Sequence, residues 1–355
     1  MTQDSPCPDC QAIETSGVNR REFVQTAGVI AGAALLPRVL NAAEEQPQKP
    51  VAENLAAKLY ESLSDAQKKE VCFPWEHTDD RGVLRTHVSN NWHITDRNRL
   101  TVAGGFFNKE QQDIIEALFF SLYNPEWHDR IRKQLKDDAG GYGKQQTIAM
   151  FGAPGTDHFE FVMTGRHLTI RCDGNSTEHM AFGGPIFYGH AAQGFNEKPN
   201  HPGNVFWSQA LKANAVYQML DGKQRELALV DRSPYESEVG FRSPNKIDGI
   251  PVSELSADQK EHVAGVLDAL LEPYREIDRK EARACLEARG GLDACRLAFY
   301  KNDDAGKSND LGDDGIWDWW RLEGPAFVWN FRGIPHVHVW VNVSDDPNVK
   351  TNAAG

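Results

Sequence analysis

The chain has 355 residues, 40% of them hydrophobic, which is enough apolar surface for a substantial core in one large domain or two small ones. Acidic residues outnumber basic ones by 51 to 38, and no long basic run or basic amphipathic helix occurs. This composition argues against nucleic acid as a partner.

Residues 1–43 have the pattern of a twin-arginine export signal. Arg20 and Arg21 precede a short apolar run at 29–36, and small residues follow up to Ala43. The run is well short of the roughly 18 residues that a spanning helix needs, so a cleaved signal is preferred to a membrane anchor. We therefore expect a periplasmic or secreted protein that uses the Tat export machinery and keeps no stable membrane span.

The elements after the signal begin with a linker at 44–53. Helical spacing follows over 54–71, where Ser64 or Asp65 starts a helix, and Asn108 opens a clear amphipathic helix. A further helical run, PEWHDRIRKQLKDDAGGYG, ends at glycines, as helix C-termini commonly do.

The middle of the chain changes to short alternating segments separated by glycine-containing turns, the pattern of an antiparallel sheet: TIAMFGAPG, HFEFVMTG and RHLTIRCDG. Residues 204–220 are helical, and residues 256–302 are expected to form two more helices, the first capped by Ser256. The last 40 residues return to strands. Because helices and strands come in blocks, we predict an α+β fold with helices packed on an antiparallel sheet. Residues 54–345 form a single predicted domain, 346–355 form a tail, and no internal repeat is evident.

Four cysteines remain after the signal, and an even number in an oxidising compartment indicates disulfides. Cys285 and Cys295 flank a Gly-Gly break and form the expected bridge. The sequence leaves open whether Cys72 pairs with Cys172.

Several segments, taken in order, resemble one family. They are the hairpin FEFVMTGRHLTI, the turn GGPIFYG, the helix QALKANAVYQML, and the closing EGP with its His-x-His strand. Together they are similar to DUF3500, over roughly residues 70 to 345. The resemblance implies a shared fold, a shared Gly-x-His-Leu hairpin at His167 and a shared terminal pair at His336 and His338. It implies no reaction.

The pair His336 and His338 is the strongest chemical signal. Alternate residues of a strand point to one face, and these two lie about 7 Å apart along it. Imidazole suits zinc, copper, iron and nickel, so the pair can form half of a metal site. The first choice for a third ligand is His167, and the weaker candidates are His190, His158 and His179, with Glu160 on the same face as His158. The alternative is a pair on an exposed sheet face or hydrogen-bonded in the core.

We therefore predict an exported metalloprotein with a three-histidine site for copper or zinc, and a redox role is preferred. Glu323 and Glu160 are candidate general bases, and Tyr188 is a candidate proton donor. The alternatives are a metal-dependent hydrolase, a metal-free hydrolase with paired carboxylates, and a metal-free module that binds carbohydrate or cell wall through some of the nine tryptophans. The substrate is not identified, although a small molecule or a component of the cell envelope fits each alternative.

Overall fold

The computed structural model describes residues 51–174, 176–191, 201, 203–303, 306–309 and 316–353. The predicted signal peptide and most of the predicted linker lie outside the described residues, so export stays a prediction. Among the helices that are described, none is both long enough and apolar enough to cross a membrane.

Eight α-helices occur in the described part of the chain, and the predicted helix starts are confirmed. Ser64, Asn108 and Ser256 each cap a helix through a side-chain oxygen, and a glutamine three residues later completes a capping box. The helix bounds are α2 Val51–Ser62, α3 Asp65–Val71, α4 Lys109–Ser121, α5 His128–Ala139, α6 Trp207–Met219, α7 Gly222–Ala228, α8 Ala257–Leu271 and α9 Glu276–Glu287.

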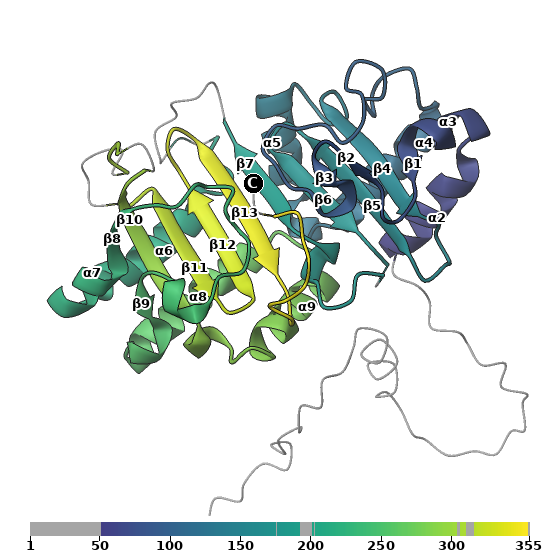
Figure 1. Ribbon diagram of the computed structural model, residues 1–355. Coiled ribbons are helices and arrows are strands. Elements are labelled where there is room, and N and C mark those ends of the chain that lie inside the picture. Colours follow the sequence, from purple (N-terminus) through teal and green to yellow (C-terminus); the bar gives the residue numbers. More distant parts are fainter. Residues whose placement is uncertain are drawn as a thin grey trace, which may run out of the picture. The chain divides into compact units, whose positions relative to one another are not determined.

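An 11-stranded sheet forms the centre of the fold (Figure 1), in the order β1-β4-β5-β6-β7-β13-β12-β11-β10-β8, with β9 paired to β10. Only β1–β4 and β8–β10 are parallel, so the predicted α+β class with an antiparallel core is confirmed. The bounds are β1 Cys72–Phe73, β4 Gln146–Gly152, β5 Phe159–Gly165, β6 Leu168–Cys172, β7 Ile186–His190, β8 Leu229–Arg232, β9 Ile250–Pro251, β10 Arg296–Asn302, β11 Trp319–Gly324, β12 Phe327–Arg332 and β13 Val337–Val343, and a separate hairpin pairs β2 Thr78–Asp79 with β3 Gly82–Val83.

One helix prediction needs correction, because residues 296–302 form β10 rather than the end of a helix. The chain leaves α9 through Gly290 and Gly291, which both have positive φ and end the helix. Residues 296–302, RLAFYKN, then pair with β11 on one side and β8 on the other.

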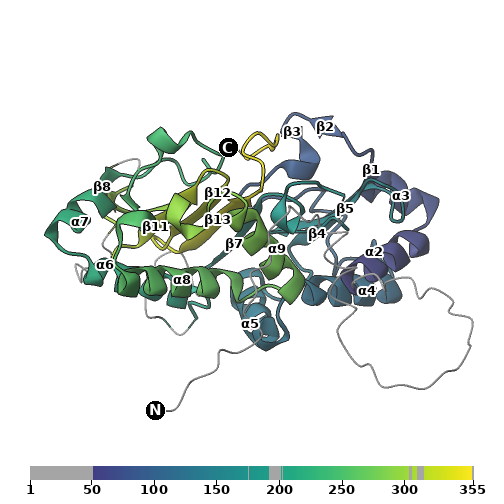
Figure 2. The same ribbon diagram turned by 90° about the horizontal axis from the view of Figure 1, so that it is seen from below.

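The two faces of the sheet are covered differently (Figure 2). Helices α2, α4, α6 and α8 lie along one face, and loops cover the other. In strand β13, side chains alternate between these two faces. Val337, Val339, Val341 and Val343 join the main core under the helices. Trp340 instead joins the smaller cluster under the loops, and His336 and His338 share its face.

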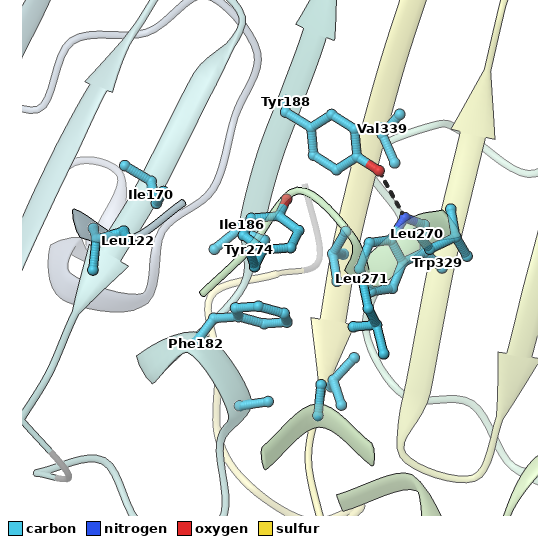
Figure 3. Close-up of a cluster of buried hydrophobic side chains, with 14 of the residues drawn as sticks. Leu122, Ile170, Phe182, Ile186, Tyr188, Leu270, Leu271, Tyr274, Trp329 and Val339 are labelled. Atoms are coloured by element: carbon cyan, nitrogen blue, oxygen red, sulfur yellow. Dashed lines mark hydrogen bonds between the residues drawn. The ribbon is translucent and has the colours of Figure 1, made fainter. Parts of the chain in front are cut away.

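The main core crosses the middle of the sheet (Figure 3). Ile186 and Tyr188 of β7, Val339 of β13 and Trp329 of β12 meet Tyr274 there, beside the end of α8. This packing holds β7 and β13 in register, with Tyr188 opposite Val339.

The two halves of the described chain repeat one order of elements. Each half has two helices and an edge strand, followed by two more helices and four antiparallel strands. These elements are α2, α3, β1, α4, α5 and β4–β7 in the first half and α6, α7, β8, α8, α9 and β10–β13 in the second. From one edge the sheet runs β1-β4-β5-β6-β7, and from the other edge it runs β8-β10-β11-β12-β13, so corresponding strands occupy corresponding places. The pairing of β7 with β13 joins the two halves. The fold therefore has a pseudo-two-fold arrangement that the sequence does not reveal.

Matching contacts support this arrangement. Gln111 in α4 donates to the carbonyl of Ser62 at 2.8 Å, and Gln259 in α8 donates to the carbonyl of Met219 at 2.9 Å. Each glutamine also pairs with the capping-box glutamine of the preceding short helix, Gln67 or Gln224.

The halves also meet through reciprocal backbone hydrogen bonds next to Tyr123 and Tyr274. The Asn124 N–H donates to Pro273 O at 2.8 Å, and the Arg275 N–H donates to Leu122 O at 3.0 Å.

The predicted disulfides are absent, because none of the four described cysteines is joined in one. Strands β4 and β5 lie between Cys72 and Cys172, a separation of about 14 Å at the usual strand spacing, twice the reach of a disulfide. Cys285 is buried on α9, whereas the thiol of Cys295 lies against Gly324, where an added Cβ would come within 2.8 Å of Sγ. Burial raises the pKa of Cys295 to about 12.

Candidate metal site

The histidine pair lies at the start of β13, where the sheet meets the loops. His336 is 6% exposed and His338 is 3% exposed. They stand on the loop-covered face because the intervening Val337 points into the helix-side core. The buried-strand pattern of β13 therefore places both imidazoles on one face, as the sequence predicted.

His167 comes from the tight turn between β5 and β6. Gly165 pairs with Leu168, so Arg166 and His167 form a two-residue loop. His167 has φ 51°, and Asn91, whose side-chain oxygen accepts the His167 N–H at 3.1 Å, has φ 46°. Left-handed backbone at a residue other than glycine is unfavourable, and it concentrates at functional sites. His167 and Asn91, which both have this backbone conformation, therefore meet beside His336 and His338.

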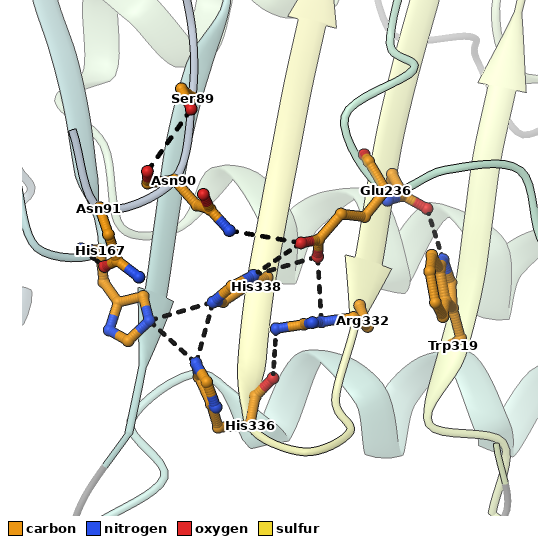
Figure 4. Close-up of polar contacts among 10 residues, drawn as sticks. Ser89, Asn90, Asn91, His167, Glu236, Trp319, Arg332, His336 and His338 are labelled. Carbon is orange, nitrogen blue, oxygen red and sulfur yellow. Dashed lines mark hydrogen bonds and ion pairs between the residues drawn. The ribbon is translucent and has the colours of Figure 1, made fainter. Parts of the chain in front are cut away.

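The three imidazoles converge through their Nε2 atoms (Figure 4). The Nε2 of His167 lies 3.0 Å from that of His336 and 3.1 Å from that of His338, and the last two are 2.9 Å apart. All three residues are buried. The sequence predicted this set of three as the first choice, and the structure brings them together.

Two carboxylates bind the outer nitrogens of the cluster. Asp138, at the end of α5, accepts from Nδ1 of His167, and its side chain is fully buried. Glu236, in the loop after β8, accepts from Nδ1 of His338 at 3.0 Å. A carboxylate on one imidazole nitrogen fixes the tautomer and directs the other nitrogen's lone pair at a metal. The proton of His167 and of His338 is thus on Nδ1, and both Nε2 atoms carry lone pairs.

An arginine accompanies each of these carboxylates. Arg166 Nε lies 2.9 Å from Oδ1 of Asp138, and Arg332 Nε lies 3.0 Å from Oε2 of Glu236. Burial raises the pKa of Asp138, but the hydrogen bond from His167, together with Arg166, outweighs burial and holds that pKa below its usual value. Asp138 is therefore ionised near neutral pH.

The electrostatics keep the histidine pair uncharged. Burial, and then the neighbouring His167 imidazole and the guanidinium of Arg332, lower the pKa of His336 to about 3. Burial and then Arg332 lower the pKa of His338 well below its usual value. Since the Nε2 atoms of His167 and His338 both carry lone pairs, they cannot hydrogen-bond to each other. The arrangement brings unprotonated nitrogens together and suits a cation between them.

The spacing fits a first-row transition metal. A triangle with sides of 2.9, 3.0 and 3.1 Å has its centre about 1.7 Å from each nitrogen. At metal–nitrogen distances of about 2.0–2.1 Å the ion would lie about 1.1 Å out of this plane, with N–metal–N angles of about 94°. Three ligands on one side of the ion leave the other side for exogenous ligands, as in catalytic rather than structural zinc sites.

Packing against β7 fixes the rings. Gly189 pairs with His338, and a Cβ added at Gly189 would come within 3.2 Å of Cδ2 of His167. The ring of Phe187 lies 5.2 Å from that of His338 and 4.8 Å from that of Trp340. The ring of Phe187 thus covers the cluster from the β7 side and is itself backed by Trp340.

The other candidate ligands lie elsewhere. His190 pairs with Val337, so its side chain points to the helix-covered face. His158 is exposed and stacks on Trp75, and it precedes β5, whereas His167 follows β5, about 20 Å away along the strand. His179 is exposed and pairs with Asp345 at 2.6 Å.

The candidate catalytic side chains make other contacts. Glu160 is buried between Arg85 and Arg171, at 3.0 and 3.1 Å, and burial raises its pKa although both arginines oppose the shift. Glu323 pairs with Arg242, whose Nε lies 2.7 Å away.

Tyr188 lies on the helix-covered face of the sheet. Its hydroxyl donates to Gln209 at 2.9 Å. The same hydroxyl accepts from Trp329 at 3.1 Å (Figure 3). None of the three side chains has a hydrogen bond to the histidine cluster among the contacts of the described residues.

Sequence reasoning missed Asp138, Glu236, Arg166 and Arg332. Asp138 is 29 residues from His167, and Glu236 is 102 residues from His338, so no local spacing links them. The one available signal was the position of Arg166 beside His167 in the tight turn.

A family model described as a protein of unknown function, DUF3500, matches residues 44–339. No curated protein and no solved structure matches the chain.

Proposed function

Because the chain belongs to the DUF3500 family, which is described as having no known function, we propose a function from the geometry: His167, His336 and His338 bind one transition-metal ion in an exported metalloprotein. The observation that carries the proposal is the set of three Nε2 atoms within 3.1 Å of one another, two of them with their outer nitrogen held by a carboxylate. Carboxylate–histidine pairs of this kind are typical of metal centres.

The halves of the fold both contribute to this site. His167, with Asp138 and Asn91, belongs to the first half, and the pair in β13, with Glu236, belongs to the second. A ligand site where two substructures meet is a common arrangement in enzymes.

Within this proposal, redox chemistry is preferred to hydrolysis. Hydrolysis at a metal is assisted by a general base near the reacting water. Among the described residues, the carboxylates that touch the cluster are Asp138 and Glu236, and both are already paired with an imidazole and an arginine. Three neutral nitrogen ligands suit copper as well as zinc. Copper would agree with the predicted export, and zinc would instead favour a hydrolase.

A carbohydrate-binding module is less well supported. Binding through tryptophan needs exposed rings, yet seven tryptophans are buried, and Trp75 and Trp317 are half-buried. No described tryptophan is exposed, so the structure offers no row of exposed tryptophan rings on which a sugar could stack.

The proposal is tested by measuring the metal content of untagged protein purified from the periplasm, by mass spectrometry of the digested sample. We expect about one copper or zinc per chain in the wild type and little metal in a His336→Ala/His338→Ala variant. The matched control is His158→Ala/His179→Ala, which removes two exposed histidines and should keep its metal. Circular dichroism verifies that each variant is folded. Equal metal in the wild type and the His336/His338 variant would contradict the proposal.

A further inference from the structure

The charges around the three imidazoles balance before any metal is added. The carboxylates of Asp138 and Glu236 are matched by the guanidinium groups of Arg166 and Arg332. These four groups carry two negative and two positive charges, and an imidazole that binds a metal through its lone pair is neutral. The three ligands and these four groups together therefore have a formal charge of zero.

A divalent ion would bring two positive charges into this buried place. His167, the least exposed ligand, is 1% exposed, and His336, the most exposed, is 6% exposed. An isolated charge is strongly unfavourable in such surroundings unless an opposite charge accompanies it. Metal sites with a carboxylate or thiolate ligand supply that charge from the protein, whereas this site has three neutral ligands and carboxylates that arginines already neutralise.

The open side of the ion is where the opposite charge can enter. The three nitrogens lie on one side of the proposed metal position, so an exogenous ligand can reach the opposite side.

We propose that the metal-loaded centre binds an anion on its open side, either a small inorganic anion or the carboxylate or phosphate group of a substrate. This inference rests on the proposed metal site and adds the charge class of its ligand. A neutral ligand would leave two positive charges buried, and an anion reduces them to one or none.

The charge argument predicts that two substitutions weaken anion binding. Arg166→Gln and Arg332→Gln each remove a positive charge beside the cluster and leave the carboxylates that orient the imidazoles in place. At the separations of this site each change should lower anion affinity roughly tenfold. Arg132→Gln is the matched control, since Arg132 is exposed on α5 and pairs with Glu116. Its effect should stay within about twofold because solvent screens exposed charges.

The experiment uses full-length protein saturated with cobalt(II), whose visible spectrum reports its ligands. Sodium azide, sodium acetate and inorganic phosphate are titrated separately, and neutral imidazole serves as the uncharged comparison. We expect a spectral change with at least one anion at concentrations well below those that imidazole needs. A response to azide alone identifies a small inorganic ligand, and a stronger response to acetate or phosphate identifies an organic acid or a phosphate ester as the substrate class.

The outcomes separate the two proposals. If cobalt does not bind the wild type in a way that depends on His336 and His338, the metal site itself fails and this inference fails with it. If cobalt binds but imidazole binds as well as the anions do, or if neither arginine substitution weakens anion binding, the metal site stands and the inference is overturned.

Discussion

The carboxylate of Asp138 offers the sharpest single test of how the site is built. Asp138→Asn keeps the size and shape of the side chain but removes the ionised oxygen that accepts from Nδ1 of His167. The amide can present its NH2 group instead, which would favour the tautomer with a proton on Nε2 and block the metal-binding lone pair.

The expected size of this effect follows from the contact. Loss of the partner that orients a metal-binding histidine typically weakens metal affinity by about 10- to 100-fold. This corresponds to about 1.4–2.7 kcal/mol of binding free energy. The fully buried side chain of Asp138 leaves no water to replace the carboxylate, so we expect the upper half of that range.

Competition with a chromophoric zinc chelator measures the affinity, and thermal unfolding in the absence of metal measures the fold. The neighbouring Asp137→Asn is a close control. It makes the same charge change one residue earlier on α5, where the side chain is partly exposed and pairs with Lys133. Identical zinc affinities for the two variants, with the fold intact in both, would refute the role given to Asp138.

Three further predictions follow from the pKa shift and the packing. Because the pKa of His336 is about 3 in the folded protein, below its usual value, the unfolded state binds more protons between about pH 3 and 6.5. The free energy of unfolding of the metal-free protein should therefore decrease as the pH is lowered through that window. Chemical denaturation at pH 7 and pH 4.5 should show a smaller decrease in His336→Asn than in the wild type, and an equal decrease would contradict the shift. The pseudo-two-fold contacts predict that Gln111→Ala and Gln259→Ala each destabilise the protein by about 1–3 kcal/mol in urea denaturation, and a large effect of one alone would count against their equivalence. Gly189→Ala would place a methyl group 2.3 Å from a carbonyl oxygen of β13 and 3.2 Å from the His167 ring. The free energy of unfolding should therefore fall by about 1–3 kcal/mol, and zinc affinity should fall with it. Unchanged zinc affinity would show that packing of the rings on β7 is unimportant.

Local patterns were enough to predict much of the fold. Caps such as Ser64 and Asn108 followed from residue type and spacing, because a cap is a contact within four residues of sequence. The two faces of β13 followed from strict alternation, which placed His336 and His338 together.

Features that depend on the packing of distant segments were not predictable in the same way. The carboxylates of Asp138 and Glu236 reach the site from a helix end and a loop, and no spacing in the sequence marks them. The Cys285–Cys295 bridge was predicted from proximity in sequence, yet the two residues lie on different elements, in α9 and just before β10. The choice of His167 over His190 and His158 came from the hairpin motif rather than from geometry.

The central claim is that three imidazoles share one ion, and anomalous scattering from crystals grown with zinc tests it most directly. We predict a single strong peak about 2.0–2.1 Å from the Nε2 atoms of His167, His336 and His338, and none in crystals of the His336→Ala/His338→Ala variant. Well-ordered wild-type crystals with no peak between these three rings, or with zinc only at exposed histidines such as His179, would contradict the account.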